Sequence, residues 1–294
     1  MITPQSQQRK LAKALGLNVP LYFKREDLHP LLSHKGRSIP TMINEYQKKG
    51  IASFVISSSG NAALAAGLYI KQYNKNHKNK LTLQIFVGEK IDQKKLNLLN
   101  KIQTKNISII KIKNPKQEAF KIDKARKAKI LRQSTDDLAL KGYHQLAKEL
   151  SKIKKISAIF IPTSSGTTAQ GLYDGFKKIK LKPQIYIVQT TACYPLAKNF
   201  FSADYKIASS PSIAGAIVDK VAHRKEKVVA DIKNSHGFGW VANNKEIKDV
   251  QKLVYKNEKI RLSNNSALAI VGLTQALKQK RKFNGPVVCL ITGQ

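Results

Sequence analysis

The residue whose surroundings most favour covalent chemistry is Lys35, in the stretch Ser33-His34-Lys35-Gly36-Arg37. It follows a short β-rich segment and a turn that contains Pro30, and it precedes Pro40, where a helix could begin. Adjacent cations and partial burial both favour the neutral lysine, which is the form that attacks a carbonyl carbon to give a Schiff base. The stretch alone also fits an ordinary surface lysine, so the choice depends on the rest of the chain.

Two turns carry residues that suit the binding of anions. They are Ser57-Ser58-Ser59-Gly60-Asn61-Ala62 and the stretch from Pro162 to Gly171, which is rich in serine and threonine. Small hydroxyl residues and a glycine before a helix leave several backbone N–H groups exposed, which favours a carboxylate or a phosphate. The second turn has neither the ending of a Walker loop nor the dinucleotide fingerprint, which argues against an ATPase or a dehydrogenase. Each turn alone also fits a plain helix cap.

A third candidate is the apolar run 286–291, which leads into Thr292-Gly293. It places a hydroxyl at the carboxyl end of a predicted strand, although a plain C-terminal strand with a polar end fits equally well. Ligands of parallel sheets bind beyond the carboxyl ends of the strands. A reactive lysine, Asn61, a phosphate-type turn and a hydroxyl at such an edge together indicate a site for a phosphorylated carbonyl cofactor.

The elements that position these residues alternate between strands and helices. Short apolar runs predict strands over 52–56, 81–87, 107–112, 157–161, 184–188 and 286–291. Helical spacing of apolar residues predicts helices over 62–73, 93–102, 117–131, 137–150 and 168–179. This alternation predicts an α/β fold with mainly parallel sheets and helices on their faces. No strand is expected between 112 and 157, which places a boundary there between a smaller domain of 35–139 and a larger, cofactor-binding domain of 140–294 with 1–34.

The composition is that of a globular protein with an unusual charge. The chain has 294 residues, 42% of them hydrophobic, and a net charge of +35, which raises the question of a nucleic-acid or anionic membrane partner. Of its basic residues, eight are Arg and 45 are Lys. Nucleic-acid readers rely on Arg and on aromatic side chains. We therefore interpret the charge as a general lysine bias on solvated helix faces, and expect only weak, salt-sensitive contact with polyanions.

Cysteines and apolar runs place further limits on the class of protein. Cys193 and Cys289 form no disulfide framework and no metal-ligand spacing, so no metal is expected. The first twenty residues are too polar for a signal peptide, and no apolar run reaches the ~18 residues of a membrane span. A reducing, cytoplasmic location is the resulting expectation.

The order of the motifs resembles the pyridoxal-phosphate enzymes of the tryptophan synthase β type, the fold type II family that includes threonine synthase, threonine dehydratase and cysteine synthase. The run Lys24-Arg25-Glu26-Asp27, followed by 33–37, is similar to the Lys-x-Glu-Asp and Ser-x-Lys-x-Arg block of that family. The run 58–61 is similar to its Ser-Gly-Asn loop, and 164–171 stands at its Gly-rich phosphate loop, with hydroxyl residues in place of several glycines. The resemblance covers almost the whole chain and implies two three-layer αβα domains with the cofactor in the cleft between them.

The resemblance also implies a role for each matching residue. Lys35 would be the catalytic residue, holding pyridoxal 5'-phosphate as a Schiff base and then moving the proton at the substrate Cα. The carboxylate of an amino-acid substrate would bind at Ser58, Ser59, Gly60 and Asn61. The cofactor-binding residues would be Lys35, Asn61, Ser165, Gly166, Thr167, Thr168 and Thr292. In this set Asn61 would contact the ring hydroxyl, 165–168 the phosphate, and Thr292 the pyridine nitrogen. A hydroxyl at that nitrogen leaves it largely unprotonated, which suits elimination or replacement at Cβ or Cγ.

Within the family, the motifs point to more than one reaction. The Ser-Ser-Gly-Asn-Ala turn, the Thr-rich loop and the final Thr-Gly look most like threonine synthase, whereas Lys-Arg-Glu-Asp-Leu looks more like the dehydratases. We expect a threonine-synthase-like lyase that acts by β- or γ-elimination or replacement. The alternatives are a serine/threonine dehydratase and a cysteine-synthase-like β-replacement enzyme. The alternative of another class is a basic, polyanion-binding protein on a decayed fold of this kind. We further expect a homodimer with a small amino-acid substrate, no membrane contact and no specific nucleic-acid partner.

Overall fold

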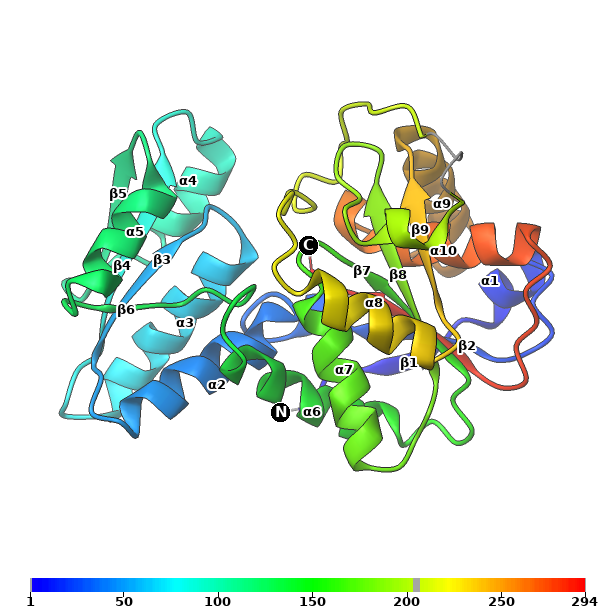
Figure 1. Ribbon diagram of the computed structural model, residues 1–294, viewed down its shortest axis with the longest axis horizontal. Coiled ribbons are helices and arrows are strands. Elements are labelled where there is room, and N and C mark those ends of the chain that lie inside the picture. The colour runs from blue at the N-terminus through cyan, green and yellow to red at the C-terminus, as the bar shows by residue number, and fades with distance from the viewer. Residues whose placement is uncertain (1, 203–206, 294) are drawn as a thin grey trace. The chain divides into compact units, whose positions relative to one another are not determined.

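The structure is a computed structural model that describes residues 2–202 and 207–293 (Figure 1). The chain divides into two compact units. The small unit is His29–Gly142, and the large unit combines Met1–Leu28 with Tyr143–Gln294. The large unit is therefore built from two separate stretches of the chain, and the small unit is one continuous stretch inserted between them.

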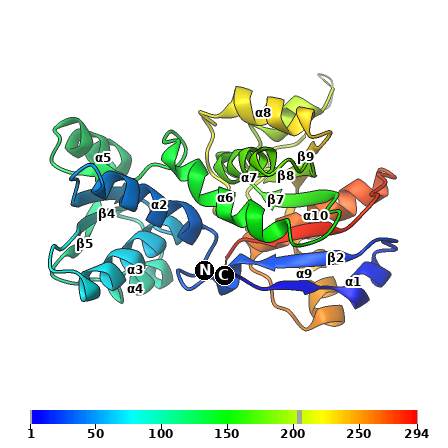
Figure 2. The ribbon, with the colours of Figure 1, turned by 90° about the horizontal axis from the view of Figure 1, so that it is seen from below.

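The small unit is built around a four-stranded parallel sheet. In spatial order its strands are β5 (Ile107–Ile112), β4 (Thr82–Gly88), β3 (Ser53–Ser57) and β6 (Lys129–Ile130). The helices are α2 (Lys35–Gln47), α3 (Asn61–Asn76), α4 (Gln93–Asn100) and α5 (Pro115–Lys124). Apolar side chains of α2, α3 and α4 pack on one face of the sheet, and α5 packs on the other. Figure 2 shows α3 and α5 on opposite sides of the strands.

The large unit contains a six-stranded sheet. Its order is β1 (Gln5–Gln7), β2 (Leu21–Arg25), β10 (Val287–Ile291), β7 (Ala158–Pro162), β8 (Gln184–Thr190) and β9 (Phe238–Ala242). All neighbours are parallel except β1, which is antiparallel to β2. The helices are α1 (Arg9–Ala14), α7 (Thr167–Lys178), α8 (Lys225–Asn234), α9 (Asn244–Glu258), α10 (Asn264–Lys278) and the part of α6 (Leu138–Leu150) that begins at Tyr143, since the start of α6 belongs to the small unit. The sequence-based prediction of an α/β fold with two parallel-sheet domains is thus confirmed.

Strand β10 shows why the predicted strands are continuous apolar runs. Its side chains alternate between two cores: Val287, Cys289 and Ile291 pack with α1, α9 and α10, whereas Val288 and Leu290 pack with α6, α7 and α8. Each of the five is at most 1% exposed. Because helices cover both faces of a parallel sheet, no position of a central strand can be polar without a buried partner.

Two expectations about the stretch 112–157 are wrong. The helix predicted over 117–131 ends at Lys124, and the chain then forms β6 beside β3, so the stretch does contain a strand. Arg126 has φ +56°, which ends the helical path, and the Ile130 amide donates to Asp123 Oδ1 at 3.0 Å as the chain turns back. The prediction failed because Ala128 and Ile130 continue the apolar spacing of the helix. In the structure they pack against the same core as α5, but Ala128 does so from the turn and Ile130 from β6.

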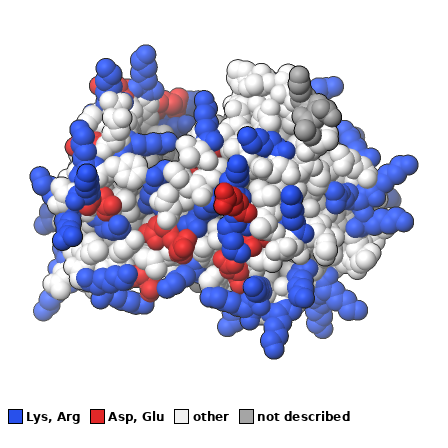
Figure 3. Space-filling view, viewed as in Figure 1, with Lys and Arg blue, Asp and Glu red and all other residues white. Residues whose placement is uncertain are grey.

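The basic side chains are spread over the visible face of each unit (Figure 3), with acidic side chains in small groups among them. Among the described residues, no helix is both long enough and apolar enough to cross a membrane. Within the same residues, no three His, Cys, Asp or Glu side chains are grouped so that they could hold a metal ion.

Candidate functional site

The predicted site residues follow the carboxyl ends of strands, apart from Lys35. In the small unit, Ser58 to Asn61 follow β3. In the large unit, Ser165 to Thr168 follow β7, and Thr292 follows β10, which pairs directly with β7. The structure therefore brings the two predicted cofactor-binding segments of the large unit to the same edge of one sheet.

Lys35 is the first residue of α2. The expectation that a helix begins at Pro40 is wrong, because Pro40 lies inside α2, one turn beyond its start. The amide of Lys35, one of the first N–H groups that have no partner within the helix, donates to Ser33 Oγ at 3.3 Å. The carbonyl of Gly36 has no N–H at position 40 to accept from, since proline lacks one.

The environment of Lys35 favours the neutral amine. The side chain is half-buried, and desolvation lowers its pKa from 10.5 to about 8. The positive end of the helix dipole acts at the same position and in the same direction. About one tenth of such an amine is neutral at pH 7, against less than a thousandth of an ordinary lysine.

His29 fixes the backbone next to Lys35. Its imidazole lies against Gly36, where an added Cβ would be 2.2 Å from His29 Cε1. The amide of Leu31 donates to His29 Nδ1 at 3.0 Å, so that nitrogen is an acceptor. His29 is buried. The first turn of α2 therefore has room for glycine but not for a larger residue at position 36.

The turn after β3 forms the start of α3. Gly60 is the N-cap residue, and no side chain caps the helix there. The Gly60 amide donates to Ser58 Oγ at 3.3 Å, a long hydrogen bond. Ser58, Ser59, Gly60 and Asn61 are all half-buried. Uncapped amides at the first turn of a 16-residue helix suit a carboxylate.

The turn after β7 is shaped for a phosphate-sized anion. Gly166 has φ +88° and is the N-cap residue of the 12-residue helix α7, and a Cβ at this position would be 2.7 Å from Val228 Cγ2. A glycine is therefore required both by the backbone conformation and by the packing. Ser165 Oγ and Thr167 Oγ1 are 2.9 Å apart, and 163–171 contains no acidic residue. Hydroxyls, amides and a helix N-terminus, in a turn that has no carboxylate of its own, fit a phosphate.

Thr292 lies at the end of β10 and is buried. Its hydroxyl is 3.5 Å from Ser266 Oγ, and the neighbouring Gly293 carbonyl accepts from Ser263 Oγ and Ser266 Oγ at 2.6 and 2.7 Å. These bonds tie the end of the chain to the start of α10. They hold an uncharged hydroxyl at a position where the resemblance expects the partner of a ring nitrogen.

The charged residues that precede Lys35, from Lys24 to Asp27, form ion pairs that stabilise the fold. Lys24 is fully buried and donates to Glu149 Oε2 at 2.6 Å and to the Thr3 carbonyl at 2.8 Å. Arg25 makes a two-pronged ion pair with Asp27, with distances of 2.9 and 2.8 Å. Both pairs lie within the large unit, where the first ties β2 to α6 and the second joins the end of β2 to the turn that follows it.

Gln189, beside the phosphate-type turn, was missed by sequence reasoning. Gln189 is fully buried in β8 and donates from Nε2 to the Ser164 carbonyl at 3.1 Å, and the Ser164 hydroxyl accepts from the amides of Val218 and Asp219. The signal that could have revealed Gln189 is its polarity at the end of the apolar run Ile185-Tyr186-Ile187-Val188.

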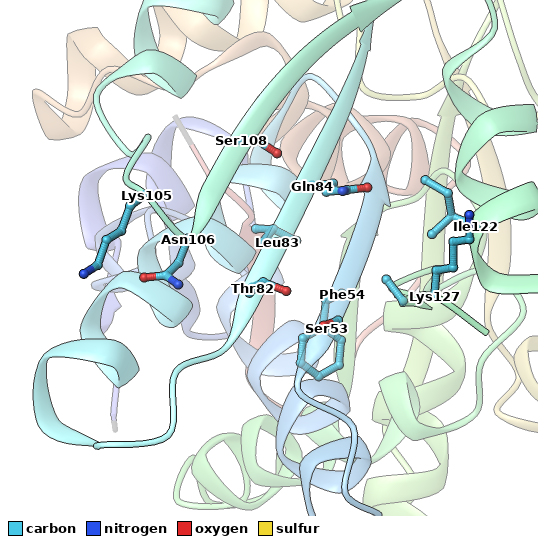
Figure 4. Close-up of a pocket in the computed structure, with 11 residues that line it drawn as sticks. Ser53, Phe54, Thr82, Leu83, Gln84, Lys105, Asn106, Ser108, Ile122 and Lys127 are labelled. Atoms are coloured by element: carbon cyan, nitrogen blue, oxygen red, sulfur yellow. The ribbon is translucent and has the colours of Figure 1, made fainter. Parts of the chain in front are cut away.

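The small unit also contains a hollow of about 350 Å³ (Figure 4). It lies where β3 and β4 begin and is lined by Ser53, Thr82, Gln84, Lys105, Ser108 and Lys127, among others. None of the predicted site residues lines it. Since the turn 58–60 follows the carboxyl end of β3, this hollow lies at the other edge of the same sheet and is separate from the predicted site.

The sequence pattern of a family described as pyridoxal-phosphate dependent enzymes matches residues 2–293. Threonine synthase from Methanocaldococcus jannaschii is 23% identical over 314 residues, which cover 99% of this chain and 74% of that protein. Threonine dehydratase from Nicotiana attenuata is 23% identical over 296 residues, with 99% of this chain covered. The chain spans about half the length of that dehydratase (47%).

Solved structures share the fold. The processed form of threonine deaminase isoform 2 from Solanum lycopersicum superposes with a TM-score of 0.82 and 21% identity, covering 99% of this chain and 78% of that one. Serine racemase from Dictyostelium discoideum gives a TM-score of 0.81 and 20% identity, covering 99% and 91%. Because the family pattern extends over almost every residue, this chain belongs to the pyridoxal-phosphate-dependent enzymes, and pyridoxal 5'-phosphate is its cofactor.

Proposed function

We propose that the protein is a threonine-synthase-like lyase that acts on an amino acid by elimination or replacement at Cβ or Cγ, with Lys35 as its catalytic residue. The observation that carries the proposal is the state of Lys35, a half-buried amine at a helix start whose pKa is lowered to about 8. The threonine synthase likeness and the Thr-rich turn after β7 support this reaction over others in the family.

The cofactor, when bound, withdraws electrons from the Cα of an amino acid, which makes loss of the Cα proton and of a leaving group possible. The residues of this chain would supply attachment, orientation and proton transfer. Lys35 would hold the cofactor covalently and, once released by the amine of the substrate, its neutral Nζ would take the proton from Cα.

The anion-binding turns would orient both molecules. Amides of Ser58, Ser59 and Gly60 would bind the substrate carboxylate, and Asn61 would bind the ring hydroxyl. The cofactor phosphate would bind Ser165, Gly166, Thr167 and Thr168, and Thr292 would face the ring nitrogen. The uncapped helix starts and the absence of carboxylates from 163–171 support these roles.

A second candidate is a serine/threonine dehydratase. It is supported by the likeness to threonine dehydratase and by the run Lys24-Arg25-Glu26-Asp27-Leu28. Both candidates need the same lysine and the same carboxylate cradle, and they differ in the leaving group. A substrate comparison therefore separates them.

The first test concerns Lys35. Protein loaded with pyridoxal phosphate is reduced with borohydride and digested, and we expect the peptide that contains Lys35 to carry the reduced cofactor. Lys35→Arg is expected to lose this label, whereas Lys48→Arg, at the exposed C-terminal end of the same helix, keeps it. Labelling of other lysines at equal yield would contradict the proposal.

The second test concerns the reaction. O-phosphohomoserine, threonine, serine and O-acetylserine are supplied separately, and phosphate, 2-oxo acids, acetate and the enantiomers of the amino acids are measured. Release of phosphate with formation of threonine supports the first candidate, and 2-oxobutanoate from threonine supports the second. Racemisation of serine or threonine as the main reaction would overturn both.

A further inference from the structure

Gln189 occupies an unusual position in β8. The four residues before it are Ile185, Tyr186, Ile187 and Val188, and its own side chain has no exposed surface. Both ends of the amide are used: Nε2 donates to the Ser164 carbonyl at 3.1 Å, and Oε1 accepts from the amides of Leu196 and Ala197 at 2.9 Å each. An amide buried in this way is stable only while these partners stay in place.

The partners of Gln189 lie in two segments that contact each other, the turn before α7 and the segment that contains Leu196 and Ala197. Ser164 belongs to the turn that leads into α7, and Leu196 forms part of the wall against Gly166, where an added Cβ would be 3.2 Å from Leu196 Cδ1. One side chain therefore fixes both the turn and the surface on which the turn rests. The Ser164 hydroxyl adds a further anchor, because it accepts from Val218 N and Asp219 N at 3.1 and 3.2 Å.

The hydrogen bond to Ser164 also determines where the next amide points. The carbonyl of Ser164 and the N–H of Ser165 belong to one planar trans peptide unit, so they point in opposite directions. With its carbonyl turned to Gln189, this unit directs the Ser165 N–H away from β8. Among the described residues that N–H has no hydrogen-bond acceptor, which leaves it available to an anion.

We propose that Gln189 is a positioning residue that orients the Ser164–Ser165 peptide so that the Ser165 amide binds the cofactor phosphate; this inference rests on the proposed function of the turn 165–168. Without the side-chain donor, the half-buried Ser164 would lose the hydrogen-bond partner of its carbonyl. The peptide would then rotate to regain a donor, and the Ser165 N–H would leave the anion site.

The main test uses Gln189→Met, which keeps the length and loses all three hydrogen bonds. The matched control is Gln275→Met on α10. Gln275 Nε2 also makes two partly buried hydrogen bonds, to Val241 O at 2.9 Å and to Glu246 Oε1 at 2.8 Å. The dissociation constants of pyridoxal phosphate and of pyridoxal, which lacks the phosphate, are measured on each cofactor-free protein, together with the unfolding temperature.

We expect Gln189→Met to weaken pyridoxal phosphate binding about tenfold or more and to leave pyridoxal binding unchanged, a loss equal to about 1.4 kcal/mol or more. The ³¹P resonance of the bound cofactor should also shift. Gln275→Met should lower the unfolding temperature without changing the ratio of the two constants. An unchanged ratio in Gln189→Met, or an equal change in the control, would overturn the inference.

A second variant covers the case in which Gln189→Met does not fold. Gln189→Glu, measured at pH 8, keeps an acceptor for Leu196 N and Ala197 N but places a second oxygen against the Ser164 carbonyl, so the same loss of preference for the phosphorylated ligand is expected. If Gln189→Glu keeps the wild-type ratio, the inference is wrong. If the wild-type protein itself binds both ligands equally, the proposed phosphate role of 165–168 fails instead.

Discussion

At the scale of single residues, Lys35 combines two properties that oppose each other in most lysines. It is close enough to solvent to react and sufficiently desolvated that its pKa falls to about 8. Keeping the charged ammonium form at this position lowers the stability of the folded protein, because a desolvated cation is less stable than a solvated one. A reactive lysine therefore has to be supported by the packing around it.

We predict that covalent capture of pyridoxal phosphate by the cofactor-free protein accelerates as the pH rises and levels off above about pH 8. The sign follows from the lowered pKa, since the neutral amine is the reactive form and its fraction increases until the pH passes the pKa. The rate is measured by borohydride trapping at a series of pH values. Nα-acetyl-lysine serves as the control amine, and a protein profile that rises with a midpoint near 10, like the control, would contradict the prediction.

At the scale of elements, helix α2 decides where Lys35 lies. Its start depends on close contact between His29 and Gly36, which no other residue type allows without movement. Alanine is the better helix former by about 1 kcal/mol, so in open space Gly→Ala would stabilise a helix. Here the steric effect should prevail over the helix propensity.

We predict that Gly36→Ala lowers the free energy of unfolding by about 1–3 kcal/mol, the usual cost of forcing an extra carbon into a packed site. Denaturant unfolding of the cofactor-free protein measures this change. Gly88→Ala, at the end of β4 with no atom within 4 Å of the added carbon, is the matched control and should be nearly neutral. His29→Ala combined with Gly36→Ala should recover part of the loss. A Gly36→Ala protein as stable as wild type would show that the first turn can shift freely.

How well the sequence predicted an element depended on whether its pattern was local. The strand expected over 107–112 has those bounds in the structure, because its four isoleucines mark the whole of the strand. The strand expected over 184–188 continues to Thr190, since Gln189 and Thr190 are polar yet buried. The start of α2 was misplaced because Pro40 resembles a first-turn proline, and the end of α5 because its apolar spacing runs on into β6.

In the candidate site too, residues in local sequence patterns could be predicted, whereas residues defined by distant contacts could not. Turns after strands could be located from hydroxyl residues and glycines, which is why 58–61, 165–168 and 292 were singled out, and their roles in binding stay predictions. Gln189 could not be assigned, because its partners lie 25 residues before it and 7 and 8 residues after it in sequence. Contacts of this kind depend on how the loops fold back over the sheet, which no periodicity reveals.

At the scale of the whole molecule, the large unit depends on its final strand. β10 pairs with β2 on one side and with β7 on the other, so it joins the N-terminal part of the sheet to the rest. Both of its faces are packed against helices. Damage to this strand should therefore affect the unit as a whole rather than one edge.

We predict that Val288→Asp, which places a carboxylate at a fully buried position of β10, prevents cooperative folding of the large unit. Trp240, the one tryptophan of the chain, is 2% exposed in the same unit and should move to a solvent-like emission wavelength. Val218→Asp, at a position 62% exposed in the same unit, is the control and should leave the emission unchanged. A buried-type spectrum and a cooperative unfolding transition in Val288→Asp would contradict the prediction.

The central place of β10 also governs how the protein can fold as it is synthesised. The small unit is one continuous stretch, so all of its strands are available early in translation. β2 is made before the small unit, yet its parallel neighbour β10 is made after it. Until then β2 has an open, apolar edge of the kind that pairs with the wrong strand. The nascent chain therefore has to protect β2 until β10 has been made, and we expect its folding yield to depend on this delay.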